Sequence, residues 1–290
     1  MAANDLDPRA ILATLGYSAA GTVTPVSGGR DTAIFRVEHR DSAYALRVFR
    51  PEQARASQGE MRAMQVAEAG DLPVPRVHAY GVHAGRPAML LSWCAGRTVL
   101  DALVERPARA EPLGIAAGRT LARMHAIVVP VEYQDRSWLR WGAREPGDPL
   151  RPWLETAARH DRLLHLDYHP LNLLTDGEEI TAVLDWANAH AGDPRADLAR
   201  SITIARLDTG DLPREWRPAI RAFERGLRRG YVEQTGPLPE MARFHVWAGQ
   251  AMLHDLAPRL ASNPAQTTRI QRWVRLWKSL VRDSAPANRG

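Results

Sequence analysis

The sequence predicts an α+β protein of two lobes, a small antiparallel sheet followed by a larger group of helices. Within the first 92 residues, several short runs of alternating or clustered apolar residues are separated by turn residues, which is typical of strands. From Thr98 on, apolar residues recur at helical spacing. The length of 290 residues exceeds the usual size of one domain, so two lobes are expected.

The N-terminal lobe is expected to hold five strands and one long helix. A short helix begins at Pro8 and ends near Gly16. The long helix covers Glu52 to Ala69 and is ended by Gly70. The strands of the sheet are expected at residues 22–26, 32–39, 43–49, 76–80 and 87–92. The lobe boundary is placed near residue 95, so residues 1–95 form the first lobe.

Helices are expected to dominate the second lobe, residues 96–282. Leu113, Ala117, Leu121 and Met124 recur at helical spacing on its first long helix. Three more amphipathic helices are expected at about 214–234, 239–257 and 264–282. Residues 283–290 are expected to be a flexible tail.

The composition is that of an ordinary globular protein, with 45% apolar and 24% charged residues. Lys278 is the only lysine, so 37 of the 38 basic residues are arginine. These arginines are scattered among acidic residues, and a nucleic-acid partner is therefore not expected despite a net charge of +5. The single cysteine, Cys94, excludes an internal disulfide.

No apolar run approaches the roughly twenty residues that a membrane helix needs. The N-terminal residues have neither a basic flank nor an apolar segment, so no secretory signal is visible. We therefore expect a cytoplasmic protein without a membrane partner, present as a monomer or a homodimer.

The stretch from His165 to Asp185 contains three oxygen-bearing side chains at suggestive positions. Asp167 is followed by Asn172 five residues later and by Asp185 thirteen residues after that. Two short strands joined by a turn are expected between Asn172 and Asp185, which would bring these two residues together. Phosphoryl transfer from a nucleotide needs a carboxylate at the attacking hydroxyl and oxygen ligands for magnesium ions. Asp167, Asn172 and Asp185 can fill these roles in that order.

Simpler interpretations of the same residues remain open. An Asp or Asn near a hairpin is often a turn residue that makes local hydrogen bonds. The four-residue spacing of His165 and His169 could indicate a metal pair. Pro170 and the lack of a glutamate between the two histidines argue against a metalloprotease helix.

The Asp-x-x-x-x-Asn spacing is that of the protein-kinase catalytic loop. The whole stretch resembles the aminoglycoside phosphotransferase family, whose loop reads roughly His-Gly-Asp-Leu-His-Pro-Gly-Asn with a later Ile-Asp-Trp. The four polar signature residues are present as His165, Asp167, His169 and Asn172. The family's glycine, leucine and glycine are replaced by Leu166, Tyr168 and Leu171.

This resemblance implies a protein-kinase-like fold and a role for each signature residue. Asp167 would be the catalytic base or the residue that orients the hydroxyl, and Asn172 and Asp185 would hold Mg²⁺. His165 would brace the loop, with His169 as a further supporting residue.

The segment from Gly192 to Ala199 resembles the part of the family that opens the next helix behind the catalytic loop. Asp193 is expected to cap that helix, with Pro194 at its first position. Asp197 is expected to support the loop from behind.

The nucleotide is expected to bind to the N-terminal lobe. Ser27, Gly28 and Gly29 are a candidate lid over its phosphates, because glycines let backbone amides approach a phosphate. Taken alone, such a Gly-Gly turn is an ordinary hairpin.

Arg47 falls where the family places its phosphate-binding basic residue, with Glu60 as its expected partner. The alternative is a surface arginine on an edge strand. Trp93 and Cys94 resemble the hinge whose backbone would bind adenine.

The resemblance implies Mg²⁺-dependent transfer of the γ-phosphoryl group of ATP or GTP to a hydroxyl of a small molecule. The family includes kinases of antibiotics, such as aminoglycosides and macrolides, and of metabolites, such as choline and homoserine. Residues 206–290 are rich in arginine and tryptophan, which favours a neutral or partly apolar acceptor over a polycation. The alternative is a nucleotide-binding pseudokinase or regulatory module, whose usual marker is a missing base or metal ligand.

Overall fold

The computed structural model describes residues 6–26, 32–134, 137–145, 147–208 and 212–283. The chain divides into two compact units. Unit 1 comprises Met1–Gly96 and Thr181–Ala187, and unit 2 comprises Arg97–Ile180 and Asn188–Gly290. The segment with Asp185, which the sequence analysis grouped with residues 96–282, thus belongs to unit 1.

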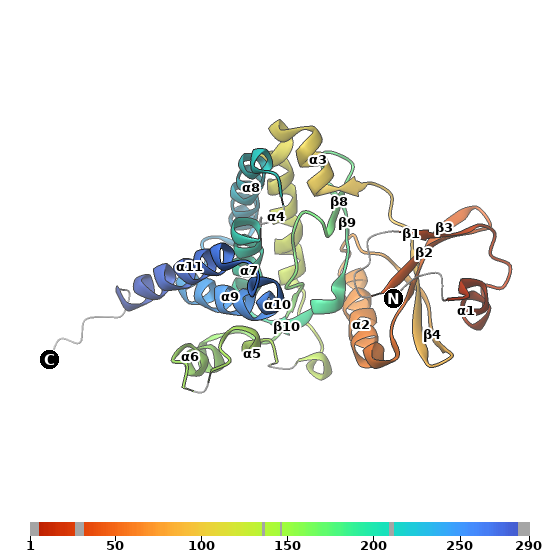
Figure 1. Cartoon of the computed structure of the whole chain (residues 1–290), viewed down its shortest axis with the longest axis horizontal. Helices are drawn as coiled ribbons and strands as arrows, with labels where there is room; N and C mark the ends of the chain where they lie inside the picture. The colour runs from red at the N-terminus through yellow and green to blue at the C-terminus, as the bar shows by residue number, and fades with distance from the viewer. Residues whose placement is uncertain (1–5, 27–31, 135–136, 146, 209–211, 284–290) are drawn as a thin grey trace. The chain divides into compact units, whose positions relative to one another are not determined.

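Unit 1 is built on the predicted five-stranded antiparallel sheet (Figure 1), and the strand order of this sheet is β1-β2-β3-β5-β4. The strands are β1 Val23–Val26, β2 Ala33–His39, β3 Ser42–Val48, β4 Val77–His83 and β5 Arg86–Ser92. The helices of this unit are α1 Pro8–Thr14 and α2 Ala54–Ala69, and a 3₁₀ turn, η2 Pro51–Gln53, precedes α2. The predicted sheet and its long helix are therefore confirmed.

The two faces of this sheet bury different residues, because successive side chains of a strand point to opposite faces. Leu46 and Val48 of β3 are fully buried in a cluster that includes Ile11 and Leu12 of α1. Arg47 lies between them in the sequence and points to the other face. Since β3 is the central strand, Arg47 is not on a sheet edge.

Unit 2 is mainly helical, as predicted. Its helices are α3 Val99–Glu105, α4 Ala110–Ala126, α5 Leu139–Gly142, α6 Leu150–Ala157, α7 Pro194–Leu207, α8 Arg217–Thr235, α9 Met241–Asp255, α10 Ala257–Leu260 and α11 Pro264–Asp283. The 3₁₀ turns η3 Pro107–Arg109, η4 Val131–Tyr133 and η6 Arg214–Trp216 lie between them. Because α11 continues to Asp283, that residue is helical, and the rest of the predicted tail lies outside the described residues.

Short antiparallel pairs flank the segment that carries Asp167. β7 Arg162–Leu164 pairs with β10 His190–Gly192, and β8 Leu173–Thr175 pairs with β6 Arg97–Thr98. The loop 165–172 therefore begins and ends in hydrogen-bonded strands. β9 Ile180–Val183 and the 3₁₀ turn η5 Trp186–Asn188 follow, where the chain passes through unit 1.

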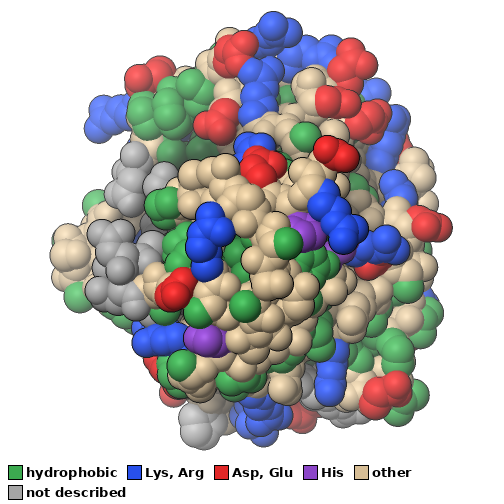
Figure 2. Space-filling view, turned by 90° about the vertical axis from the view of Figure 1, so that its right-hand side faces the viewer, with side chains coloured by type: hydrophobic (Ala, Val, Ile, Leu, Met, Phe, Trp, Pro, Cys, Tyr) green, Lys and Arg blue, Asp and Glu red, His purple; other side chains and the backbone are tan. Residues whose placement is uncertain are grey.

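Charged side chains of both signs are interspersed on the face of the molecule shown in Figure 2. Within the described ranges, no helix is long and apolar enough to cross a lipid bilayer.

In unit 2, helices α4 and α8 approach each other so closely at four glycines that an added Cβ atom would meet backbone atoms of the other helix. Gly114 and Gly118 of α4 face Gly226 and Gly230 of α8, which runs beside α4 in Figure 1. A Cβ atom at Gly118 would lie 2.2 Å from the carbonyl oxygen of Leu227. These glycines therefore set how near the two helices can approach.

We predict that Gly118→Ala lowers the free energy of unfolding by about 2 kcal/mol or more, because the helices must separate. Gly59→Ala on α2 is the matched control, since nothing lies within 4 Å of its added Cβ. The control should be neutral or stabilising by about 0.5–1 kcal/mol, the gain in helix propensity. Chemical denaturation measures both variants, and equal stabilities would contradict the close contact.

Candidate catalytic loop and phosphate-binding residues

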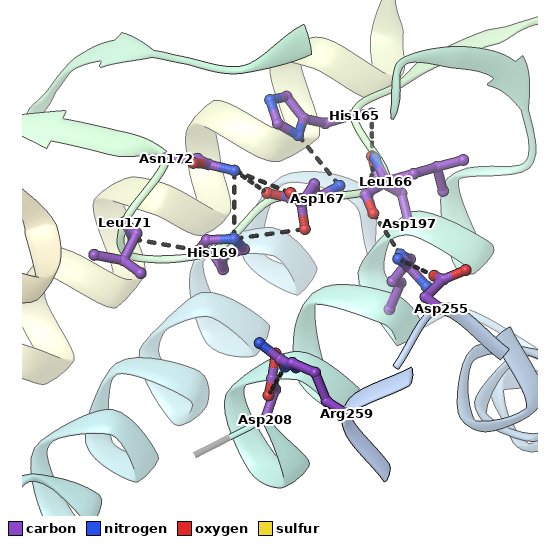
Figure 3. A network of polar contacts seen from close by, with 11 residues as sticks. His165, Leu166, Asp167, His169, Leu171, Asn172, Asp197, Asp208, Asp255 and Arg259 are labelled. Atoms are coloured by element: carbon purple, nitrogen blue, oxygen red, sulfur yellow. Dashed lines mark hydrogen bonds and ion pairs between the residues drawn. The ribbon is translucent and has the colours of Figure 1, made fainter. Parts of the chain in front are cut away.

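The loop from His165 to Asn172 closes on itself through its polar side chains (Figure 3). Asn172 Nδ2 donates to the carbonyl oxygen of Asp167 at 3.0 Å and lies 3.3 Å from its carboxylate Oδ2. His169 Nε2 lies 3.5 Å from the other carboxylate oxygen of Asp167. These contacts bring three of the predicted residues into one cluster within unit 2.

The Asp167 carboxylate is held in its ionised form. Burial opposes ionisation, but the hydrogen bond and charge of His169, followed by the charges of His165 and Arg200, lower the pKa of Asp167 to about 2. Its side chain is 27% exposed, so a small molecule can reach it. At neutral pH this group therefore accepts hydrogen bonds and is a weak base.

Asp197 supports the loop from behind, in the position expected from the sequence. Its fully buried carboxylate accepts hydrogen bonds from the backbone N–H of His165 at 2.6 Å and of Leu166 at 2.9 Å. His125 Nε2 lies 3.1 Å from the same carboxylate, and His125 Nδ1 lies 2.8 Å from the Tyr231 hydroxyl. His125 and Tyr231 connect α4 and α8 to the loop through Asp197.

The helix that carries Asp197 is fixed at its start by Asp193. The Asp193 side chain caps α7 by accepting from Arg195 N at 2.9 Å, and it also accepts from Arg159 N at 2.8 Å. Pro194 occupies the first helical position, where the missing N–H costs no helical hydrogen bond. The predicted cap is therefore present.

Leu166 has an unusual backbone conformation for a leucine, with φ = 59°. This left-handed region favours glycine, the residue that the family signature has at this position. The Leu166 side chain is fully buried in a core cluster with Trp138, Leu164 and Trp247. A buried leucine thus replaces a glycine in a conformation that the surrounding contacts must impose.

Arg200 contributes a hydrogen bond to this loop that the sequence analysis did not foresee. Its Nε donates to the carbonyl oxygen of Leu166, and its Nη2 pairs with Asp255 Oδ2 at 2.6 Å. Arg200 follows Asp197 by three residues on α7, so both side chains lie on one face of that helix. Its spacing from Asp197 is the sequence signal that could have identified it.

A cavity of about 90 Å³ opens beside Asp167 in unit 2. Its lining includes the charged residues Asp167, Arg200, Asp208 and Asp255 and the apolar residues Met252 and Leu256. Asp208 pairs with Arg259 at 2.9 Å, so the acidic groups beside Asp167 are neutralised in part by arginines (Figure 3). The sequence analysis missed both Asp208 and Asp255.

In unit 1, Arg47 contacts several polar partners at once. It pairs with Glu60 through Nη1, donates from Nε to Thr32 Oγ1 at 3.2 Å, and lies 3.4 Å from Asp185 Oδ1 through Nη2. Burial raises the pKa of Glu60 against the opposing charge of Arg47. Asp185 has φ = 59° and a 47% exposed side chain. Arg47 and Asp185 are therefore neighbours in unit 1, whereas Asp167 and Asn172 belong to unit 2.

Of the remaining residues predicted to contact the nucleotide, the structure describes Trp93 and Cys94. The backbone N–H of Trp93 bonds to Ala43 O at 3.1 Å, and Arg36 lies over the Trp93 ring at 4.9 Å. Cys94 is half-buried, and burial raises the pKa of its thiol. Ser27, Gly28 and Gly29 lie outside the described residues.

Across the described ranges, no group of three or more His, Cys, Asp or Glu side chains is gathered so that it could hold a metal ion. The two Mg²⁺ ligands predicted from the sequence are the side-chain amide of Asn172 and the carboxylate of Asp185. The Asn172 amide nitrogen is used for hydrogen bonds to Asp167, which directs its Oδ1 elsewhere. An amide oxygen and a carboxylate are ligands that suit Mg²⁺ when phosphates supply the others.

Comparison with known proteins identifies relatives of this arrangement. A thermostable mutant of aminoglycoside phosphotransferase APH(4)-Ia, in ternary complex with AMP-PNP and hygromycin B, has a TM-score of 0.64 at 18% identity. The alignment covers 96% of this chain and 98% of that chain. Aminoglycoside phosphotransferase APH(3'')-Id from Streptomyces rimosus has a TM-score of 0.60 at 19% identity, covering 87% of this chain and 99% of that one. These structures share the fold.

A curated relative, hygromycin-B 4-O-kinase of Escherichia coli, is 32% identical over 90 residues. These residues are 31% of this chain and only 22% of the length of that relative. The family model of the phosphotransferase enzyme family matches residues 22–244, which is more than half of the chain. The chain therefore belongs to the phosphotransferase enzyme family.

Proposed function

We propose that this protein transfers the γ-phosphoryl group of ATP or GTP to a hydroxyl group of a small molecule, with Mg²⁺ as cofactor. The observation that carries this proposal is the geometry around Asp167, an ionised carboxylate that Asn172 and His169 hold at the side of a cavity. A phosphotransferase needs such a group where the acceptor hydroxyl is presented.

In this proposal Asp167 acts mainly by orienting the acceptor. The hydroxyl donates a hydrogen bond to the carboxylate while its oxygen attacks the γ-phosphorus. A new P–O bond forms, the bond to the β-phosphate oxygen breaks, and its electron pair leaves with the nucleoside diphosphate. Because the pKa of Asp167 is about 2, the hydroxyl proton is transferred late, after the new bond has made it acidic.

The nucleotide is assigned to residues of unit 1, in line with the predicted nucleotide-binding lobe 1–95. Arg47 is proposed to bind the phosphates, because its planar fork can contact several oxygens and stays charged when partly buried. The adenine or guanine is proposed to bind to backbone groups of Trp93 and Cys94 other than the Trp93 N–H, which bonds to Ala43 O. Bound Mg²⁺ would neutralise the phosphate charge, with Asp185 and Asn172 as its protein ligands.

The acceptor is assigned to the cavity of unit 2. Its wall combines carboxylates, Asp208 and Asp255, with the apolar side chains of Met252 and Leu256. An acceptor with hydroxyl or amino groups on one side and an apolar face on the other matches this wall. Because carboxylates can pair with amino groups, the candidate acceptors include aminoglycosides as well as macrolides, choline and homoserine.

The proposal is tested by measuring nucleotide turnover with Mg²⁺ across this panel, with ATP and GTP compared. Asp167→Ala should lower kcat by about 10²-fold or more, the scale of a positioned general base or orienting group. Nucleotide Kd and thermal stability should change little, since Arg47 and Glu60 are untouched. Near-normal turnover in this variant would remove Asp167 from the mechanism.

Arg47→Ala is expected to weaken nucleotide binding by roughly 10- to 150-fold, because charged hydrogen bonds to phosphate are lost. Arg47→Lys should recover only part of this loss, since a point charge replaces a fork. Calorimetric Kd values are compared with those of Arg62→Ala, an exposed arginine of α2. Binding by Arg47→Ala within about twofold of the control would exclude a phosphate contact.

Asp185→Asn should raise the Mg²⁺ concentration needed for half-maximal turnover by at least about tenfold, because a charged ligand becomes neutral. Nucleotide affinity measured with Mg²⁺ should fall, and affinity measured in EDTA should not. A titration with the same Mg²⁺ dependence as the wild type would show that Asp185 is not a ligand.

A further inference from the structure

The residue that precedes the proposed catalytic aspartate is held in an unfavourable conformation. Leu166 has φ = 59°, which any residue with a Cβ atom rarely adopts. Its side chain is fully buried and packed in the core, so the backbone cannot relax by turning that side chain into solvent. Some contact must therefore hold the peptide groups of Leu166.

Both polar groups of Leu166 have partners on α7. Its N–H donates to Asp197 Oδ1 at 2.9 Å, and its carbonyl oxygen accepts from Arg200 Nε. Asp197 and Arg200 therefore bind both peptide groups of Leu166 from one helix, Asp197 as the acceptor and Arg200 as the donor. We call this pair the α7 clamp.

The guanidinium group of Arg200 is itself fixed in place. Its Nη2 pairs with Asp255 Oδ2 at 2.6 Å, and the guanidinium carbon lies 5.4 Å from the centre of the Trp141 ring. The Arg200 side chain is only 8% exposed. These contacts and the burial of Arg200 restrict the orientation of its guanidinium group, so it can define the position of the carbonyl that it contacts.

We propose that Arg200 is a positioning residue, which directs the Asp167 carboxylate toward the cavity by holding the carbonyl of Leu166. This inference rests on the proposed function, because Asp167 acts there on the acceptor hydroxyl. Asp255 sets the orientation of Arg200 and also lines the cavity, so the acceptor-facing wall and the catalytic loop share one ion pair.

The first test measures the loop itself and needs no activity. In the full chain, hydrogen exchange of the Leu166 and Asp167 amides is compared between wild type, Arg200→Gln and Arg206→Gln. Arg206 is the matched control, since it also lies on α7 and pairs at 2.7 Å with the buried Glu224 but does not contact the loop. Exchange in Arg200→Gln should be about tenfold faster or more, relative to the amides of β8, and unchanged in Arg206→Gln. Equal rates in all three proteins would overturn the clamp.

The second test separates positioning from stability. Arg200→Gln should lower kcat by about 10- to 100-fold while nucleotide Kd stays within about twofold, because the phosphate contacts are untouched. Arg200→Lys should recover part of kcat, since it keeps the charge but cannot make both bonds. Arg206→Gln should lower the melting temperature and leave kcat unchanged.

A kcat for Arg200→Gln within twofold of wild type would contradict the inference, as would an equal loss in Arg206→Gln. A wild-type protein that turns over no nucleotide with any acceptor would contradict the proposed function instead. The exchange rates would then still decide whether Arg200 holds the loop.

Discussion

The buried carboxylate of Asp197 is the constraint on which the loop around Asp167 depends. Burial alone would raise the pKa of this group, yet the hydrogen bond and charge of His125, the charge of His165 and the hydrogen bond from the His165 backbone lower it. A buried charge is stable only while its donors stay in place, and removing one of them leaves an uncompensated charge. The loop backbone, α4 and α7 are therefore tied to one anion, and the position of Asp167 follows from that arrangement.

In unit 1, the guanidinium group of Arg47 has a corresponding role, because it contacts polar side chains from several segments. One guanidinium contacts Thr32, Glu60 and Asp185 through three different nitrogen atoms, whereas a lysine would have to make all its contacts from one nitrogen. The chain has no lysine before residue 278, so the arginine is a difference in chemistry from the lysine of protein kinases. Glu60 is 3% exposed, and this burial raises its pKa. The charge of Arg47 acts in the opposite direction, so the ion pair helps to keep the glutamate ionised.

The sequence predicted the features that neighbouring residues encode. Strand alternation, helical periodicity and the Asp193-Pro194 start of α7 are local patterns, and the structure confirms the elements they indicate. Contacts between distant segments were not predictable in the same way. The bond from Arg200 to Leu166 joins residues 34 apart, and that from Val183 N to Pro73 O, at 2.7 Å, anchors the Asp185 segment to unit 1. Asp208 and Asp255 were also missed, because residues 206–290 are rich in arginine. Composition does not show that the fold brings these two acidic residues to one cavity.

The glycine contact between α4 and α8 limits the substitutions that these two helices can accept. A Cβ atom added at any of these four glycines would meet backbone atoms of the other helix, so a larger residue there would separate the helices that carry His125 and Tyr231. The cavity wall is different, since Met252 of α9 and Leu256, the residue after that helix, line it with their side chains. A substitution at Met252 or Leu256 can therefore change the shape of the cavity without moving α4 and α8, whose His125 and Tyr231 support the Asp197 carboxylate.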